Sequence, residues 1–529
     1  MAQPMCRSCG AKLEHTFVDL GMSPLANSYV KPEQLNRMEP FYPLHVYVCG
    51  KCLLVQLEQF SSPSDIFSDY AYFSSFSDSW LAHAKAYVDM ITRRYSLHKH
   101  SRIVEIASND GYLLQNFVAR GIPVLGIEPA ANVAEVAKGK GINTKVLFFG
   151  EKTALGLVED GWSADLIIGN NVLAHVPDLN DFVKGLKLLL KPTGLVTMEF
   201  PHLLQLMEQN QFDTIYHEHF SYFSLLAVEQ VFARHGMKVF DVEELPTHGG
   251  SLRIYAAHAE DVSKPVGRRA KELKSREQRA GYDRLDHYLS FSPKVEAAKR
   301  ALLSFLISAK QEGKHVLGYG APAKGNTLLN YCGVRTDLLD YTVDRSPHKQ
   351  GQFLPGVHIP IYTPERIRQT KPDYVLILPW NLRDEVMQQM SYVREWGGQF
   401  VVPIPEVKAV LNHRAQGIFL SLHQGTPEAI IVRDQDGTIR YWSREAELIY
   451  GWTAREVLGT RTHTLFKTKF PASLTAIEKE ARDKLSWKGQ LTHNRRDGSI
   501  VTVDSRWHIQ QNPQDRSLTV IEINSERAA

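Results

Sequence analysis

The segment 101-SRIVEIASNDGYLLQNFVARGIPVLGIEPA-130 decides the fold of the central part of the chain. An apolar run, SRIVEIAS, precedes the turn NDG, a stretch of helical character, YLLQNFVARG, and a second apolar run, IPVLGIEPA. Strand, helix and strand in this order predict the opening of a doubly wound parallel sheet. The pattern continues with strands at 164–173 and 195–200 and a helix at 179–190, so we expect a Rossmann-like α/β domain.

The turn after the first strand argues against a dinucleotide. Of the fingerprint G-x-G-x-x-G only Gly111 is present, so the backbone is not built to approach a pyrophosphate. A ligand without phosphates, such as S-adenosylmethionine (SAM), fits better. Glu105 lies near the end of the first strand, and Glu128, at the end of the second, stands about where an acid would hold two ribose hydroxyls. The alternative is an ordinary βαβ unit with surface acids.

Four of the five cysteines form two C-x-x-C pairs, namely Cys6, Cys9, Cys49 and Cys52. Such pairs supply four thiolates at the spacing of a tetrahedral zinc site. A site closed by four thiolates leaves no position for a substrate, so we expect structural Zn2+ in a module spanning residues 1–70, with strands at 41–49 and 53–60.

The bulk numbers exclude several classes of protein. A chain of 529 residues predicts three or four domains. Its 61 Lys and Arg residues balance 58 Asp and Glu residues without a basic block, which argues against nucleic acid as a partner. The N-terminus has no apolar signal core, and no run of 18 apolar residues occurs, so we expect a cytoplasmic protein that does not enter a membrane.

The remaining segments predict two further domains. A helix at 80–95 leads into the Rossmann-like domain, taken as 71–258. The charged stretch 268–289 is expected to be a solvated helix that joins domains, and 315–333 opens a second, smaller α/β unit within 259–410. Residues 418–529 carry β-like runs and turns at Asp436-Gly437 and Asp497-Gly498.

The densest cluster of chemical groups is 215-IYHEHFSYFS-224. A buried imidazole or carboxylate without a partner costs roughly 1–3 kcal/mol, so a purely structural segment rarely contains so many. The competing interpretation is a polar loop that cross-links two domains. If the segment is extended, His217 and His219 point in opposite directions, and only one can enter a given cleft.

In order along the chain, these motifs resemble the zinc-containing, SAM-dependent sugar C-methyltransferases of deoxysugar biosynthesis. The resemblance covers Cys6 to about residue 410 and rests on the two C-x-x-C pairs, 72-YFSSFSDSW-80, 104-VEIASNDG-111, 169-GNNVLAHVPD-178, 214-TIYHEHFSYFS-224, 248-HGGSLR-253 and 318-GYGAPAKGNTLLN-330. It implies a zinc-binding domain, a Rossmann-like methyltransferase domain and a C-terminal α/β domain that helps to hold a nucleotide-linked keto-deoxysugar.

The resemblance also implies the site residues. SAM is expected against Glu105, Ala107, Asn109, Gly111, Glu128, Asn170 and Asn171, although Ala107 replaces a glycine common in the family and narrows the turn. The catalytic group is expected at Tyr72, His175, Tyr216, Glu218 and His219. The sugar and its diphosphate are expected against His248, Gly250, Ser251, Arg253, Lys324 and Asn326, where Lys324 could instead be an exposed turn lysine.

The expected chemistry is C-methylation through an enolate. A sugar carbon becomes nucleophilic when it loses a proton next to a ketone, and a neutral imidazole can take that proton only where the oxyanion is stabilised. We expect His219 as the base, Glu218 or a tyrosine in support, and His175 or Tyr216 as the oxyanion donor, with C3 of a 4-keto sugar methylated. The alternatives are an O- or N-methyltransferase, or a catalytically inactive protein that acts as a sensor or scaffold.

The tail resembles a PAS domain, on the residues 424-QGTPEAIIVRDQDGTIRYWSREAELIYGWTAREVLG-459 and 487-WKGQLTHNRRDGSIVTVDSRW-507. This resemblance implies ligand sensing or dimerisation, and therefore a regulated enzyme or a homodimer. No cysteine follows Cys332, which excludes a flavin–cysteine photoadduct. His463 and His493 could ligate haem, but surface or packing histidines are the more common case.

Overall fold

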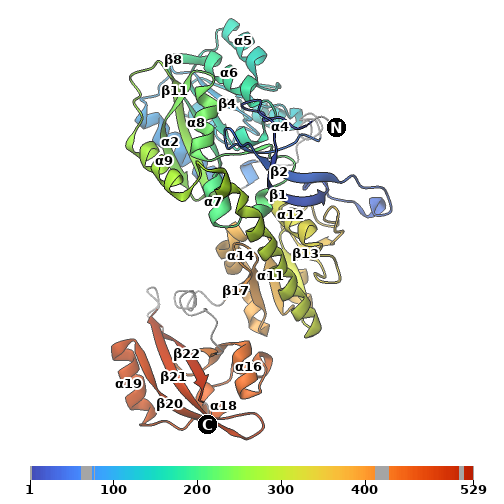
Figure 1. The fold of residues 1–529 in the computed structure, drawn as a ribbon, viewed down its shortest axis with the longest axis vertical. Coiled ribbons are helices and arrows are strands. Elements are labelled where there is room, and N and C mark those ends of the chain that lie inside the picture. Colours follow the sequence, from blue (N-terminus) through green and yellow to red (C-terminus); the bar gives the residue numbers. More distant parts are fainter. Residues whose placement is uncertain (1–2, 61–73, 77, 411–427, 512–517, 528–529) are drawn as a thin grey trace.

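The computed structural model describes residues 3–60, 74–76, 78–410, 428–511 and 518–527 (Figure 1). Within these ranges the strands form four sheets, one in each predicted part of the chain. The predicted fold class is confirmed: an N-terminal cysteine-bearing module, a Rossmann-like domain, a smaller α/β domain and a PAS-like domain follow one another. The predicted boundaries at 70 and 418 lie outside the described residues.

The N-terminal module is a small antiparallel sheet that borrows its last strand. The module itself contributes β1 (His15–Ser23), β2 (Tyr42–Val48) and β3 (Val55–Leu57). The fourth strand, β9 (Ser221–Tyr222), belongs to residues 215–224, which we call the YHEH segment. β1 was not predicted, because bulges at residues 16–18 and 19–22 interrupt the alternation and bury two consecutive side chains, Phe17 and Val18. The module is therefore joined by backbone hydrogen bonds to the predicted catalytic segment.

The central domain contains a seven-stranded sheet in the order β10-β11-β8-β7-β4-β5-β6. The five strands from β8 to β6 are parallel, and β10 and β11 close one edge in antiparallel fashion. The strands are β4 (Ile103–Ile106), β5 (Val124–Ile127), β6 (Thr144–Lys145), β7 (Ala164–Asn170), β8 (Leu190–Pro201), β10 (Met237–Leu245) and β11 (Ser251–His258). The sheet order changes direction at β4, so the crevice beyond the carboxyl ends of β4 and β7 is the expected ligand position.

Helices cover both faces of this sheet. They are α2 (Asp78–Arg94), α3 (Gln115–Val118), α4 (Ala131–Gly139), α5 (Glu151–Glu159), α6 (Leu179–Leu189), α7 (Leu203–Glu208) and α8 (Leu225–Ala233). The expected helix at 179–190 is confirmed as α6, and the Asp178 side chain caps it by accepting from the N–H of Asp181, a contact usually worth about 1 kcal/mol. The expected helix at 112–121 is only four residues long, because turns occupy its first part.

The charged connection after β11 is not simply solvated. It forms α9 (Arg268–Ala280), α10 (Leu285–Leu289) and α11 (Phe291–Gln311). Glu277 of α9 is fully buried and accepts hydrogen bonds from His202 and from the first N–H groups of α8. Phe291 of α11 stacks on Phe17 of β1 at 4.8 Å. The expectation of a solvated linker is corrected, because one face of α9 packs on the central domain and one face of α11 packs between the N-terminal sheet and the second α/β domain.

The second α/β domain has the strand order β14-β13-β12-β15-β16-β17, parallel except for β17. Its strands are β12 (Val316–Tyr319), β13 (Thr342–Val343), β14 (Ile361–Tyr362), β15 (Tyr374–Ile377), β16 (Gln399–Val402) and β17 (Lys408–Val410); its helices are α12 (Ala323–Cys332), α13 (Arg366–Thr370) and α14 (Arg383–Gln389). Its core is continuous with that of the N-terminal sheet. α12 approaches the YHEH segment, because the Thr327 hydroxyl donates to the Ile215 carbonyl at 3.0 Å.

The last domain is a five-stranded antiparallel sheet in the order β19-β18-β22-β21-β20. Its strands are β18 (Ala429–Asp434), β19 (Ile439–Trp442), β20 (Ser486–Asn494), β21 (Ile500–Gln511) and β22 (Leu518–Glu526), with α16 (Arg444–Tyr450), α17 (Ala454–Val457), α18 (Thr462–Phe466) and α19 (Leu474–Lys484) between β19 and β20. Both predicted DG turns are present, with positive φ at Gly437 and Gly498. None of the helices in the described ranges is both long and apolar enough to cross a bilayer.

Candidate active site

The four predicted cysteine ligands converge. The sulfur atoms of Cys6, Cys9, Cys49 and Cys52 all lie within 4.8 Å of one another. Gln56 donates to the Cys6 sulfur at 3.2 Å, and the neighbouring Arg7 donates to the carbonyls of Pro177 and Leu57. Four thiols and no other donor suit a closed tetrahedral zinc site. Such a site would hold the loop that carries Arg7, whose guanidinium donates to Pro177 of the central domain, so its role would be structural.

The turn after β4 adopts an unusual backbone. Ala107, Asn109 and Gly111 have φ values of 55°, 50° and 76°. A left-handed residue other than glycine costs roughly 1 kcal/mol, and such residues collect at functional sites. A methyl group on Gly111 would come within 2.1 Å of the Ile142 side chain. Ala107 thus adopts a left-handed conformation that a glycine would take at lower cost, and Gly111 is required by close packing.

Two acids flank this turn. Glu105 is 1% exposed, and its carboxylate oxygens have no hydrogen-bond partner among the described residues. Burial, followed by the charges of Glu128 and Asp110, raises the pKa of Glu105 well above its ordinary value. Glu128 accepts from the N–H groups of Asn109 and Ala130, both at 2.9 Å. A buried carboxylate without a partner is costly, so a cationic group such as the ammonium of SAM would fit beside Glu105.

The two asparagines lie where β7 ends. The Asn170 amide is 3.5 Å from the Tyr112 hydroxyl, a long contact. Asn171 has φ 54°, donates its N–H to the Glu199 carbonyl at 2.7 Å, and brings its side-chain amide within 3.1 Å of His248 Nε2. The strand end and the 247–250 loop therefore meet at the crevice.

The YHEH segment forms a tight turn. The His219 N–H donates to the Tyr216 carbonyl at 2.9 Å, so the extended geometry that we considered for this segment is wrong. The turn nevertheless separates the two histidines. His217 faces the N-terminal module, where its Nε2 donates to the Pro43 carbonyl at 3.2 Å and its ring contacts Tyr42 edge-on. His217 therefore points away from the His219 ring, as we expect if His219 is the residue that enters the cleft.

His175 and His219 form a pair. Their ring centroids lie 4.7 Å apart, and the Tyr216 ring lies 4.1 Å from that of His219. His175 Nδ1 is 2.7 Å from the Glu218 carbonyl, and His219 Nδ1 is 3.1 Å from the Thr214 carbonyl. Because a carbonyl can only accept, each Nδ1 carries the hydrogen, and each neutral ring presents its lone pair at Nε2.

Both rings are neutral around pH 7. Burial lowers the pKa of His175 to about 4. Burial, then the positive forms of His175 and His248 and the charge of Lys324, holds the pKa of His219 well below its ordinary value.

Four of the five predicted catalytic residues lie together in the structure, namely His175, Tyr216, Glu218 and His219. Tyr72, the fifth, lies outside the described residues.

Glu218 faces the N-terminal module. Its Oε1 accepts from the Asn27 amide at 2.7 Å, and burial raises its pKa. Two residues later, Tyr29 donates to the Ala321 carbonyl of the second α/β domain at 2.6 Å. Asn27 and Tyr29 were missed from the sequence, since nothing local marks them. Three domains therefore meet around Glu218.

Lys324 lies in the first turn of α12 and is largely enclosed. Its ammonium donates to Asn381 Oδ1 at 2.8 Å and lies 4.5 Å from the centre of the Trp380 ring. Burial lowers its pKa, and the charge of Asp213 opposes this. Asp213 is fully buried and accepts from Trp380 Nε1 at 2.7 Å; burial raises its pKa to about 6, against Lys324 and Trp380. Lys324 is therefore not an exposed turn lysine. Asp213, Trp380 and Asn381 were also missed.

The remaining predicted substrate residues fall into two groups. His248, with φ 56°, and Gly250, with φ 122°, form the loop beside Trp380, and the Ser251 hydroxyl donates to the Thr247 carbonyl at 3.0 Å. Asn326 is 1% exposed, and its Nδ2 has no partner among the described residues. Arg253 is different: it is 3% exposed and pairs with Glu199 at 2.7 Å and Glu243 at 3.0 Å. The Arg253 guanidinium thus already forms ion pairs with two carboxylates of the protein itself.

In the last domain the two histidines considered as haem ligands, His463 and His493, are packed against aromatic rings. The His493 ring stacks on Phe466 at 4.3 Å and contacts the Tyr450 hydroxyl at 3.0 Å, and the His463 ring stacks on Trp507. Burial lowers the pKa of each to about 3. These contacts agree with packing roles for both residues.

Four family models match successive parts of the chain. They describe a zinc binding domain at 6–67, a methyltransferase domain at 80–242, a C-methyltransferase C-terminal domain at 246–405 and a PAS fold at 419–521. The C-methyltransferase NovU of Streptomyces niveus is 36% identical over 405 residues, which make up 77% of this chain and 96% of that protein.

Other similarities are more limited. A ubiquinone biosynthesis O-methyltransferase of Rhodopseudomonas palustris is 27% identical over 97 residues, 18% of this chain and 38% of that protein. The solved structure of magnesium protoporphyrin IX methyltransferase from Synechocystis with bound SAM is 13% identical, with a TM-score of 0.26, and the match covers 34% of this chain and 79% of that one.

The central sheet, its strained turn and the acids beside it define a SAM-dependent methyltransferase. More particularly, the chain belongs to the C-methyltransferase family that includes the NovU protein, and it carries a PAS domain behind the catalytic part.

Proposed function

We propose that this enzyme methylates the carbon next to the ketone of a nucleotide-linked keto-deoxysugar, with C3 of a 4-keto sugar as the first position to test. The observation that carries the proposal is the His175–His219 pair. Each ring is held through Nδ1, and His219 lies near enough to the enclosed Lys324 for that charge to lower its pKa; the lysine would face an anionic substrate. The likeness to a C-methyltransferase over most of the chain supports the reaction type.

His219 is the proposed base. Its Nε2 lone pair would take the proton from the sugar carbon, and the Thr214 carbonyl would stabilise the imidazolium through Nδ1–H. Burial and the positive charge of Lys324, which lower the pKa of His219, make the imidazolium short-lived and favour return of the proton to solvent. Glu218 would support the substrate or accept that proton, as its raised pKa allows.

Tyr216 is the better oxyanion donor. Neutral His175 spends its only N–H on the Glu218 carbonyl, so it cannot also donate to an enolate oxygen. Tyr216 lies against the His219 ring and carries a hydroxyl donor. Tyr216 therefore fits the donor role, and His175 fits a role in orienting the base and the Glu218 backbone.

The cofactor would lie along the β4 turn. Glu105 would receive its ammonium group, Glu128 its ribose hydroxyls, and the strained backbone from Ala107 to Gly111 would approach its amino acid end, with Asn170 and Asn171 at the strand end. SAM supplies an electrophilic methyl group on sulfur, and the protein's task is to align the carbon with it. The proton lost by the sugar would pass from His219 to solvent, and the cofactor would leave as S-adenosylhomocysteine without the sulfonium charge, so atoms and charge balance.

Lys324, Asn326 and His248 would hold the sugar diphosphate side. Lys324 keeps its charge inside the protein through Asp213 and the Trp380 face, and a diphosphate would pair with it. The Asn326 Nδ2 group, which has no partner among the described residues, would donate to a further polar group of the ligand.

The product decides between this proposal and its rivals. We would incubate the purified protein with SAM and a panel of nucleoside diphosphate keto-deoxysugars and determine the product by mass spectrometry and NMR. A new carbon-bound methyl next to the ketone is expected. A methyl on oxygen or nitrogen would support the alternative methyltransferase, and failure to bind SAM or S-adenosylhomocysteine would support an inactive sensor or scaffold.

We further propose that the PAS domain regulates or dimerises the enzyme. The observation is its complete antiparallel sheet with helices packed on one face, joined to a catalytic part that belongs to the C-methyltransferase family. Removing residues 428–529 should leave SAM binding intact and change either the oligomeric state in light scattering or the response of kcat to cell extract.

A further inference from the structure

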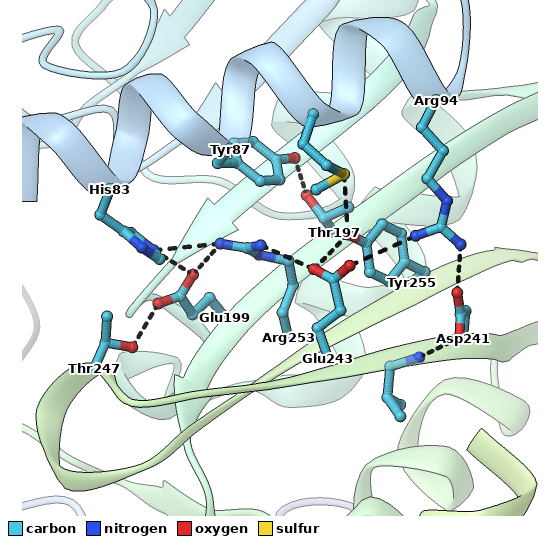
Figure 2. Close-up of polar contacts among 12 residues, drawn as sticks. His83, Tyr87, Arg94, Thr197, Glu199, Asp241, Glu243, Thr247, Arg253 and Tyr255 are labelled. Carbon is cyan, nitrogen blue, oxygen red and sulfur yellow. Dashed lines mark hydrogen bonds and ion pairs between the residues drawn. The ribbon is translucent and has the colours of Figure 1, made fainter. Parts of the chain in front are cut away.

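Glu199 occupies an unusual position at the end of β8. It lies opposite Asn170 on one side and Arg253 on the other, and its side chain is fully buried. Three donors converge on its carboxylate: Arg253 at 2.7 Å, the Thr247 hydroxyl at 2.9 Å and His83 Nε2 at 3.1 Å. Figure 2 shows this convergence between α2, the sheet and the loop after β10.

The carboxylate stays ionised. Burial acts to raise the pKa of Glu199, but the hydrogen bond from His83, the charges of Arg253 and His83 and the bond from Thr247 outweigh it and bring the pKa to about 2. Three hydrogen bonds to one buried carboxylate restrict the position of each donor, because all three donors must point at the same two oxygens. Glu199 is thus a rigid anchor for the elements that donate to it.

These elements are the ones that border the crevice. His83 of α2 stacks on Trp80 at 5.0 Å, and the Trp80 ring meets His248 at 5.4 Å. Thr247 is the residue before His248. The main-chain carbonyl of Glu199 also accepts from the N–H of Asn171 at 2.7 Å. One residue therefore holds both sides of the Asn171–His248 contact.

That contact joins two strained residues. Asn171 and His248 have φ values of 54° and 56°, and their side chains meet at 3.1 Å. Left-handed residues of this kind persist only where the surroundings determine them. Glu199 constrains both residues: its main-chain carbonyl accepts from the N–H of Asn171, and its carboxylate accepts from Thr247, the residue before His248.

We infer that Glu199 is a positioning residue for the substrate side of the crevice, which holds the 247–250 loop and Asn171 in the conformation that receives the sugar. This inference rests on the proposed function. It also gives Arg253 a role different from the expected contact with the diphosphate: Arg253 balances the charge of Glu199.

The neighbouring Glu243 is a matched control. It pairs with the same guanidinium at 3.0 Å and accepts from Tyr255 at 2.8 Å, and it also pairs with Arg94 and Arg269. In Figure 2 Arg94 lies on the side of the network away from Thr247. Substituting either acid disturbs Arg253. Only Glu199 touches the loop that carries His248.

Amide hydrogen exchange of the full chain tests the inference without requiring activity. In Glu199→Gln and in Thr247→Val, peptides covering 247–250 should exchange at least ~10-fold faster than in the wild type, whereas Glu243→Gln should change them less than ~2-fold. Thr247→Ser keeps the hydroxyl, so its peptides covering 247–250 should exchange at about the wild-type rate. Equal exchange in all variants, or equal loss in both acid variants, would overturn the inference. Thr247→Val serves if Glu199→Gln does not fold.

Kinetics then connect the anchor with the reaction. With the ketosugar that the wild type methylates, Glu199→Gln should raise the KM for the sugar at least ~10-fold, while the affinity for S-adenosylhomocysteine changes less than ~3-fold. Equal losses for sugar and cofactor would contradict a role confined to the substrate side. If the wild type methylates no sugar, the proposed function fails, and the exchange result still decides the role of Glu199.

Discussion

Replacement of Asp213 by asparagine tests whether burial raises the pKa of the carboxylate whose negative charge favours the charged form of Lys324. Asp213 is fully buried, and its pKa is raised from 3.8 to about 6. Because its folded pKa lies above the unfolded one, the ionised carboxylate destabilises the fold as the pH rises through this window. The cost reaches about 3 kcal/mol above pH 6, and about 1.4 kcal/mol of it develops between pH 5 and pH 7.5.

Asp213→Asn removes this pH dependence. The asparagine can still accept from Trp380, but its NH2 group occupies the place of Oδ1, which has no partner among the described residues. This mismatch adds a penalty of about 1–3 kcal/mol that does not vary with pH. The difference in stability between the two proteins should therefore shift in favour of the variant by about 1.4 kcal/mol from pH 5 to pH 7.5.

Urea unfolding at several pH values, followed by tryptophan fluorescence, measures this difference. Asp337→Asn, at an exposed position in the second α/β domain, is the control and should show the wild-type pH dependence. If wild type and Asp213→Asn keep a constant difference over the whole range, the carboxylate does not titrate there, and the raised pKa assigned to buried Asp213 is wrong.

Three further substitutions probe other parts of the molecule. Cys49→Ser should lower the zinc content measured by plasma mass spectrometry and reduce the Tm, since it removes one of four converging thiols; unchanged metal content would contradict a zinc site. Gly111→Ala should weaken S-adenosylhomocysteine binding at least ~10-fold in calorimetry, because its methyl meets Ile142 at 2.1 Å, and an unaltered affinity would place the cofactor elsewhere. Gly249→Ala should raise the KM for the sugar without changing cofactor affinity, because its Cβ would lie 2.6 Å from the Trp380 ring; an unchanged KM would separate this loop from the substrate.

The sequence predicted what local patterns encode. The helix at 179–190 was found because its apolar residues recur at helical spacing and Asp178 caps it. The cysteine pairs were found because metal ligands come in fixed spacings. By contrast β1 was missed because its two bulges remove the alternation on which strand prediction depends.

The site shows the same division. Tyr216, Glu218 and His219 are adjacent in sequence, so their density drew attention. Asp213 meets Trp380 across 167 positions, and Glu218 meets Asn27 across 191 positions, and no local signal marks such contacts. The role of Arg253 could not be read from its motif either, because its carboxylate partners Glu199 and Glu243 come from two other strands.

Hydrogen exchange at the sugar carbon, in deuterated solvent and without SAM, tests the central claim most directly. With the ketosugar substrate, the wild type should incorporate deuterium next to the ketone, because His219 can remove that proton before any methyl is transferred. His219→Asn and His219→Ala should show little incorporation, whereas His217→Asn, whose ring faces the N-terminal module, should retain it. Undiminished exchange in both His219 variants would contradict the account and move the base elsewhere.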